Sequence, residues 1–129
     1  IFDDKGRMLL QKRSATKDMG AGLWGISAAG HVTRGQSYDE AIHRELIEEL
    51  GVDMPIEYVT KFIVEDEDET ETSALYKGIS NGPFKPNPDE VERLEFFSPR
   101  ELTFKIATLE VVLTKYAELS LQKIGLIQH

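Results

Sequence analysis

The chain has 129 residues, 40% hydrophobic and 29% charged, which suits a single domain (1–129) with one core and leaves too little apolar content for two. Its 15 basic and 23 acidic residues give a net charge of -8, which disfavours binding to long nucleic acids. Cysteine is absent, which excludes disulfides, thiolate metal sites and cysteine nucleophiles, and fits a reducing cytoplasm.

Neither a membrane span nor an N-terminal start is visible in the sequence. No apolar run approaches the roughly 20 residues that a membrane helix requires, so no membrane partner is expected. The first residue is Ile1, not methionine, and it falls directly at an apparent strand. We therefore expect preceding residues to be missing.

The first half of the chain predicts a hairpin, a loop, a buried strand and a helix. A turn at residues 4–6 separates Ile1-Phe2 from residues 8–10, and residues 14–23 form a polar loop. Residues 24–32 are small and apolar, as in a buried strand. Ser37 is placed to cap a helix, with Glu40 completing a capping box. The helix should run to about Leu50, and Gly51 should end it.

The second half predicts three strands and helical segments. Strands are expected at residues 56–64 and 73–79, joined by an acidic loop, and again at 91–97. Ser98-Pro99 should open a short turn of helix. A C-terminal helix is predicted from apolar residues at helical spacing: Ile106, Leu109, Leu113, Tyr116 and Ala117. The pattern predicts an α/β fold, a mixed sheet with helices on its faces.

Three glutamates on the predicted helix suggest a metal site. Glu45, Glu48 and Glu49 would fall within an arc of roughly 100° on an α-helix. Like charges at such spacings destabilise a helix by about 0.2–0.5 kcal/mol per pair, and Arg44 offsets only part of this. A divalent cation would relieve the repulsion, and a carboxylate cluster suits Mg²⁺ or Mn²⁺ rather than zinc.

The helix belongs to a longer pattern that resembles the Nudix box. Gly30 is followed after five residues by Gln36, and after seven more by Arg44-Glu45-Leu46-Ile47-Glu48-Glu49-Leu50-Gly51-Val52. Every specified position matches except Gln36, where the family has glutamate, and such a match by chance is on the order of one in a million. Further likeness at residues 9–18, 23–31, 88–91 and 97–102 resembles the branch related to isopentenyl-diphosphate isomerase.

This resemblance implies a Nudix α/β/α sandwich that hydrolyses a diphosphate bond in a small substrate of nucleoside diphosphate-X type. It implies that Glu45, Glu48 and Glu49 bind Mg²⁺ or Mn²⁺ and that Arg44 holds them by ion pairs. The general base would be Glu45 or Glu90, or its neighbour Asp89. The substrate-binding candidates are four residues, each with a plain structural alternative: Lys12, Arg13, Trp24 and His31.

Two other functions remain open. An isopentenyl-diphosphate isomerase uses a cysteine just before the box, where this chain has residues 26–31 and no cysteine, so isomerase chemistry is disfavoured. A nucleotide- or metabolite-binding module with weakened catalysis is favoured by Gln36, because an amide lacks the charge of glutamate. The group attached to the diphosphate stays open, and so does a homodimer, in which the C-terminal helix could take part.

Overall fold

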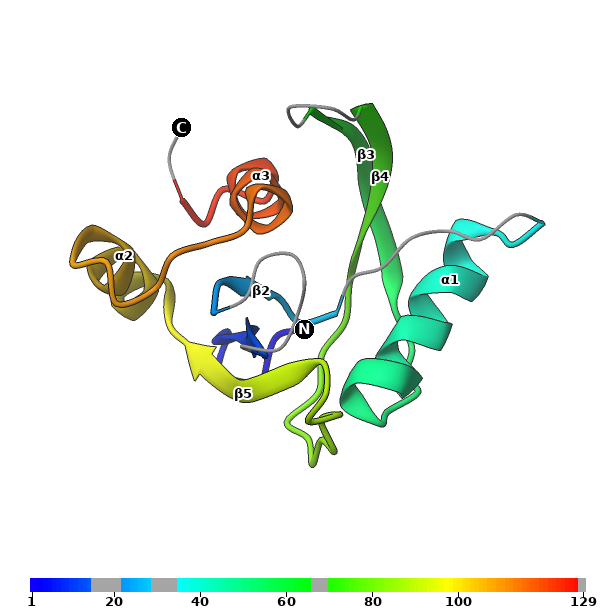
Figure 1. The fold of residues 1–129 in the computed structure, drawn as a ribbon, viewed down its shortest axis with the longest axis horizontal. Helices are drawn as coiled ribbons and strands as arrows, with labels where there is room; N and C mark the ends of the chain where they lie inside the picture. Colours follow the sequence, from blue (N-terminus) through cyan, green and yellow to red (C-terminus); the bar gives the residue numbers. More distant parts are fainter. Residues whose placement is uncertain (15–21, 29–34, 66–69, 128–129) are drawn as a thin grey trace.

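A computed structural model describes residues 1–14, 22–28, 35–65 and 70–127. Its elements are, in chain order, β1 (Met8–Arg13), β2 (Trp24–Ile26), α1 (Tyr38–Glu45), the π-helical turn η1 (Leu46–Leu50), β3 (Glu57–Glu65), β4 (Thr70–Lys77), β5 (Val91–Phe97), α2 (Pro99–Ala107) and α3 (Lys115–Lys123). Helix α1 lies on one side of the strands, and α2 and α3 lie on the other (Figure 1). The predicted α/β/α sandwich is therefore confirmed.

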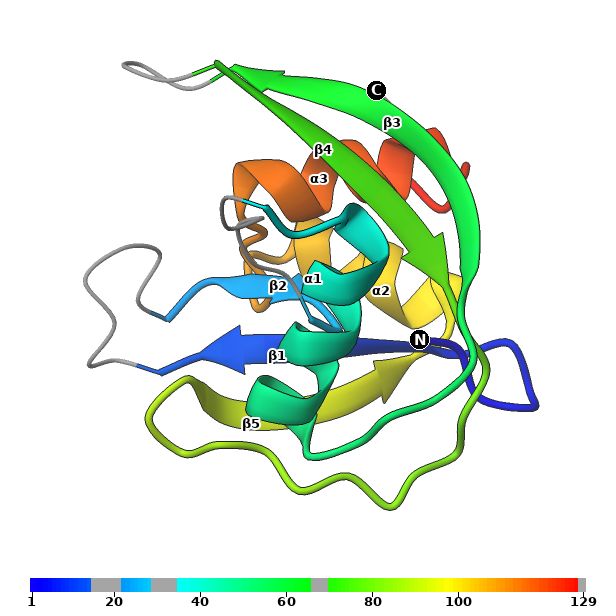
Figure 2. The ribbon, with the colours of Figure 1, turned by 90° about the vertical axis from the view of Figure 1, so that its right-hand side faces the viewer.

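The strands form two sheets linked by single bridges. One sheet has the order β2-β1-β5, and the other is the hairpin β3-β4; all pairs within the sheets are antiparallel. Phe2 bridges to Met8 in antiparallel fashion, as the predicted hairpin requires, and to Ile79 in parallel. The parallel bridges give the mixed character. The β3-β4 hairpin arches above the other sheet, beside α1 (Figure 2).

Strand β1 contributes to the core through both of its faces because side chains alternate along a strand. Met8 and Leu10 belong to one cluster, completed by residues of β2, β5, α2, the segment between α2 and α3, and α3: Trp24, Phe97, Leu102, Val111 and Leu121. Leu9 points the opposite way and packs against Leu46 and Leu50 on the α1 side. The helix formed by α1 and η1 (residues 38–50), called the box helix below, is therefore packed on the sheet through its apolar residues.

The single C-terminal helix predicted from apolar spacing is wrong. Helix α2 is longer than the predicted short turn but ends at Ala107, and Leu109 has a positive φ of 62°, which a continuous α-helix cannot contain. Leu113 then forms a β-bridge with Trp24. Helix α3 begins anew because the Thr114 hydroxyl accepts a hydrogen bond from the backbone N–H of Ala117. The apolar spacing therefore spanned two helices.

Several predicted segments lie partly outside the described residues. These are the loop at 14–23, the end of the strand at 24–32 and the acidic loop after β3. In the parts of the chain that are described, no helix is long and apolar enough to cross a membrane.

Candidate active site

The box helix begins at the predicted capping box. The Ser37 hydroxyl accepts a hydrogen bond from the backbone N–H of Glu40 at 3.1 Å, and the Glu40 carboxylate accepts one from the Ser37 N–H at 3.3 Å. Two of the N–H groups at this helix end are thereby satisfied. The start of the helix is thus defined by its own sequence.

The helix ends in a feature that the sequence did not predict, a single π-helical turn over η1. It stops at Gly51, as predicted, with φ 65° in the left-handed region. A Cβ on Gly51 would lie 2.9 Å from the carbonyl oxygen of Lys85, so the following loop approaches too closely for a side chain. Single π turns recur at functional sites, and this one contains Glu48 and Glu49.

The three box glutamates point to different surroundings. The Arg44 guanidinium lies 2.8 Å from Glu45 Oε1 through Nη2, and 3.9 Å from Glu48 Oε1 through Nε. Glu49 is instead buried, with 5% of its surface exposed. The Glu49 carboxylate is therefore held deeper in the protein than that of Glu48, whose side chain is 59% exposed.

Glu49 is held by a residue that sequence reasoning missed. The side-chain amide Nε2 of Gln11 donates to Glu49 Oε1 at 3.0 Å and to the carbonyl oxygen of Ser27 at 2.9 Å. Gln11 is itself only 3% exposed. The available signal was its place in β1, two residues after Leu9 and therefore on the same face as a core residue.

The loop before β5 docks on the end of η1 through its backbone. The N–H groups of Lys85 and Asn87 donate to the carbonyls of Leu50 and Glu49, at 2.8 and 2.9 Å. The carbonyl of Glu90 accepts a 3.1 Å hydrogen bond from the Ser14 N–H, just after β1. These bonds satisfy carbonyls at the end of the helix. They also place the loop that carries Asp89 and Glu90 against η1, called the glutamate turn below because it contains Glu48 and Glu49.

The four residues predicted to bind substrate lie in different surroundings. Trp24 is 3% exposed in the core, 5.5 Å from the Phe97 ring between centroids, so stacking on a substrate is corrected to a packing role. Lys12 forms a 3.0 Å ion pair with Glu92 and shares the face of β1 that carries Leu10, away from Glu49. Arg13 follows Gln11 by two positions and remains the candidate of the pair. His31 lies outside the described residues, as does Gly30.

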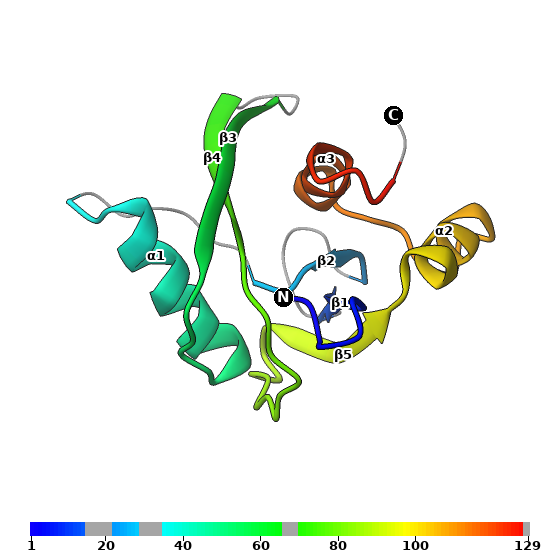
Figure 3. The ribbon, with the colours of Figure 1, turned by 180° about the vertical axis from the view of Figure 1, so that it is seen from behind.

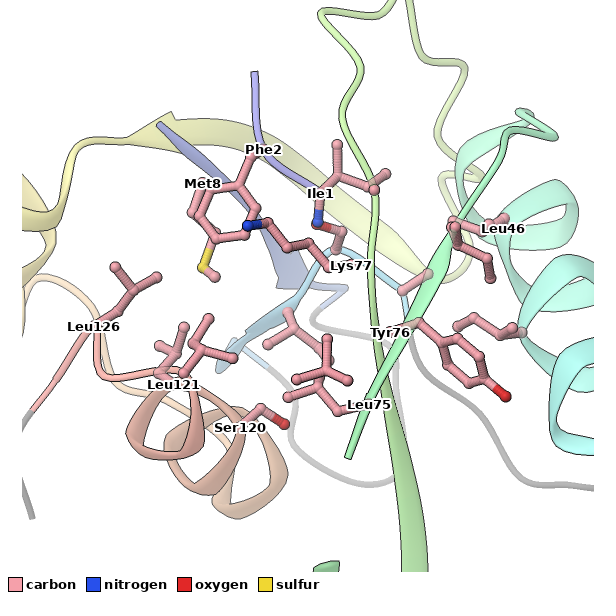
Figure 4. Close-up of a pocket in the computed structure, with 18 residues that line it drawn as sticks. Ile1, Phe2, Met8, Leu46, Leu75, Tyr76, Lys77, Ser120, Leu121 and Leu126 are labelled. Carbon is pink, nitrogen blue, oxygen red and sulfur yellow. The ribbon is translucent and has the colours of Figure 1, made fainter. Parts of the chain in front are cut away.

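A cavity of about 380 Å³ lies between β4, α3 and the box helix (Figure 4). Its walls are mainly apolar and include Ile42 and Leu46, from the helix that carries the glutamates, with Leu75 and Leu121 across from them. The buried hydroxyl of Ser120 also lines it and has no hydrogen-bond partner within the described part of the chain. An organic group could therefore be enclosed beside the glutamate helix.

The β3-β4 hairpin is fastened to the first turn of α1, and it stands between α1 and α3 (Figure 3). The Tyr76 hydroxyl donates a short hydrogen bond to Asp39 Oδ1. Partial burial, with the hydrogen bond to Asp39 and its negative charge, raises the pKa of Tyr76 to about 12. Lys61 lies 4.8 Å from the centroid of the Tyr38 ring, a cation–π contact.

The carboxylates of Glu45, Glu48 and Glu49 are chemically suited to bind a hard divalent cation, although they do not converge on one point. Across residues 1–14, 22–28, 35–65 and 70–127, no three His, Cys, Asp or Glu side chains converge in a way that could hold a metal ion. Arg44 contacts both Glu45 and Glu48, and Glu48 shares the π turn with Glu49. Carboxylate oxygens are the ligands that Mg²⁺ and Mn²⁺ prefer.

The NUDIX domain family model matches residues 1–117. An uncharacterized Nudix hydrolase from Yersinia pestis is 34% identical over 80% of this chain and 57% of its own length. An isopentenyl-diphosphate Delta-isomerase 2 from Photorhabdus laumondii is 51% identical over 49% of the chain and 36% of its own length. The chain thus spans little more than half of the first relative and about a third of the second. The crystal structure of a MutT NUDIX hydrolase from Burkholderia pseudomallei superposes with a TM-score of 0.77 at 25% identity, covering 96% of this chain and 92% of that one.

Proposed function

Because the chain belongs to the Nudix family, we propose that it hydrolyses a diphosphate bond in a small substrate of nucleoside diphosphate-X type. The observation that carries the proposal is the turn in which Arg44 pairs with Glu45 and Glu48 while Glu49 is anchored next to them. The apolar cavity against Leu46 supports an organic group attached to the diphosphate.

We propose that Glu45, Glu48 and Glu49 hold Mg²⁺ or Mn²⁺, and that Arg44 keeps Glu45 and Glu48 on the side facing the substrate. When bound, a divalent cation neutralises charge on the phosphates and favours deprotonation of water. Glu49 keeps the orientation that Gln11 gives it, and Glu45 and Glu48 would turn toward it to complete the set of ligands.

The reaction requires a water oxygen to bond to phosphorus while the bridging P–O bond breaks, and the water proton must pass to a base. Glu90 is our candidate, since its loop is docked on Glu49 by the Asn87 hydrogen bond. Glu45 is the alternative, but a proton on Glu45 would disrupt its 2.8 Å ion pair with Arg44. Asp89, which is exposed, is the second loop carboxylate.

Two alternatives follow from specific observations. One relative is named as an isopentenyl-diphosphate isomerase, but this chain contains no cysteine to act as an acid–base thiol. Gln36 in place of the first box glutamate favours a binding module with weakened turnover. Such a module would bind its ligand tightly without converting it at any metal concentration.

The experiment is a panel of nucleotide sugars, dinucleotides, nucleoside triphosphates and organic diphosphates, tested with Mg²⁺ and with Mn²⁺. Release of two phosphorylated products in the presence of metal supports the proposal. An isopentenyl diphosphate that is rearranged without phosphate release would instead favour the isomerase. Tight binding without product across the panel would favour the binding module.

We also propose that the protein is cytoplasmic, because cysteine is absent from the chain. We propose in addition that it forms a homodimer, which light scattering would test.

A further inference from the structure

Gln11 lies at the centre of a buried polar connection between β1, β2 and the glutamate turn. Its amide nitrogen contacts Ser27 O and Glu49 Oε1, and the residue is 3% exposed. The Ser27 hydroxyl in turn donates to the carbonyl of Leu9 at 2.6 Å. The connection therefore runs from the backbone of β1 through the end of β2 to a box glutamate.

The orientation of the Gln11 amide is dictated by its neighbours. A carbonyl and a carboxylate can only accept hydrogen bonds, so the atom that contacts both Ser27 O and Glu49 Oε1 must be the NH₂ group. The two hydrogens of that group match the two acceptors. Ser27 O thus fixes the amide, and the amide fixes Glu49.

A buried carboxylate needs such a fixed donor, because burial removes the water that would otherwise hydrogen-bond to it. The Glu49 side chain has several rotatable bonds, and an ordered donor selects one orientation of its carboxylate. Residues that orient ligands in this way typically change metal affinity by about 10–100-fold when mutated.

We propose that Gln11 is a positioning residue that orients Glu49 toward the cation. This inference rests on the proposed function, in which Glu49 is a ligand. Gln11 does not touch the reacting atoms; it acts through Glu49. Loss of its NH₂ group lowers the affinity for the cation and leaves the affinity for the diphosphate substrate nearly unchanged.

The test compares Mn²⁺ binding in wild-type protein, Gln11→Met and Gln11→Glu, with free Mn²⁺ followed by electron paramagnetic resonance. Methionine keeps the length of glutamine without its donors, and glutamate keeps the shape but replaces donors by a second negative charge. Leu10→Ala is the matched control, since Leu10 is the adjacent buried residue on the opposite face of β1. Thermal unfolding without metal establishes that each variant is folded at the temperature used.

We expect Mn²⁺ affinity to fall by about 10–100-fold in Gln11→Met, and at least as much in Gln11→Glu, while Leu10→Ala loses stability and keeps its affinity. In Gln11→Met, kcat at low Mn²⁺ should fall and recover as Mn²⁺ is raised, with KM for the substrate unchanged. Wild-type affinity in a folded Gln11→Met would overturn the inference alone. Failure of the wild-type protein to bind Mn²⁺ would overturn the proposed function, and this inference with it.

Discussion

The backbone N–H of Asn87 donates a 2.9 Å hydrogen bond to the carbonyl of Glu49, which joins the loop before β5 to the box helix. Lys85 makes the same kind of contact with Leu50. The position of Glu90 is therefore tied to the position of the glutamate turn. Two predictions follow from this relationship.

The first concerns Glu90 as the general base. Glu90→Gln removes the proton acceptor but keeps the shape of the side chain, so we expect kcat to fall by about 10²–10⁴-fold. Mn²⁺ affinity should stay close to that of the wild-type protein, since Glu90 is not among the proposed ligands. Glu118→Gln, at an exposed position of α3, is the control, and Asp89→Asn tests the second loop carboxylate. Steady-state kinetics with a saturating metal concentration would assign the base to Glu45 instead if both Glu90→Gln and Asp89→Asn kept their kcat.

The second concerns the close approach at Gly51. In Gly51→Ala, a left-handed conformation costs about 1–2 kcal/mol for a residue with a Cβ, and that Cβ would also lie 2.9 Å from Lys85 O. Gly6→Ala is the control, because Gly6 has φ 77° and nothing within 4 Å of the added atom. Urea unfolding should show a larger loss for Gly51→Ala, with a fall in kcat that Gly6→Ala lacks. Equal losses of unfolding free energy in the two variants would mean that the loop at Lys85 moves aside for the added Cβ at no cost in stability.

A third prediction addresses the one position at which the box departs from its pattern. Gln36→Glu restores the charge that the Nudix pattern carries, and we expect Mn²⁺ affinity to rise by about 10–100-fold, the usual effect of a residue that supports a metal ligand. Isothermal titration with Mn²⁺ measures this directly. An unchanged affinity would show that the amide serves as well as the carboxylate.

A fourth prediction uses the anchoring of the β3-β4 hairpin on α1. The raised pKa of Tyr76, about 12, means that the folded protein favours the neutral phenol. Its contribution to stability is complete below the usual tyrosine pKa of about 10 and is lost as the pH rises toward 12. The difference in unfolding free energy between the wild type and Tyr76→Phe should therefore narrow above pH 10. A difference that stays constant from pH 8 to 11 would argue against the hydrogen bond to Asp39.

The ends of the box helix were predictable because they depend on local sequence. Ser37 and Glu40 cap each other within one turn, and Gly51 supplies a left-handed residue at the other end. The interior of the box helix was less predictable from the sequence. The burial of Glu49 involves Gln11 of β1, and the π turn lies against the loop before β5. No local sequence pattern on the helix predicts that Gln11 is the hydrogen-bond partner of Glu49.

The same contrast holds for the rest of the chain. Strands β3, β4 and β5 lie close to their predicted ranges because each has a run of apolar and β-branched residues between turn signals. The C-terminal helix was mispredicted because helical spacing persisted by coincidence across residues 108–114, which pack on β2 through Leu113. For Trp24 the sequence left open a core or a substrate role, and its contacts with Phe97 and Arg93 decide for the core.

The central claim is that the glutamates of the box helix support metal-dependent hydrolysis, and one comparison tests it most directly. The diphosphate panel is run with wild-type protein, with Glu48→Gln/Glu49→Gln, and with Glu57→Gln/Glu118→Gln, which makes the same change in charge at exposed residues of β3 and α3. We predict metal-dependent turnover in the wild type and in the exposed pair, and its loss in Glu48→Gln/Glu49→Gln. Turnover that survives in a folded Glu48→Gln/Glu49→Gln variant would contradict the account.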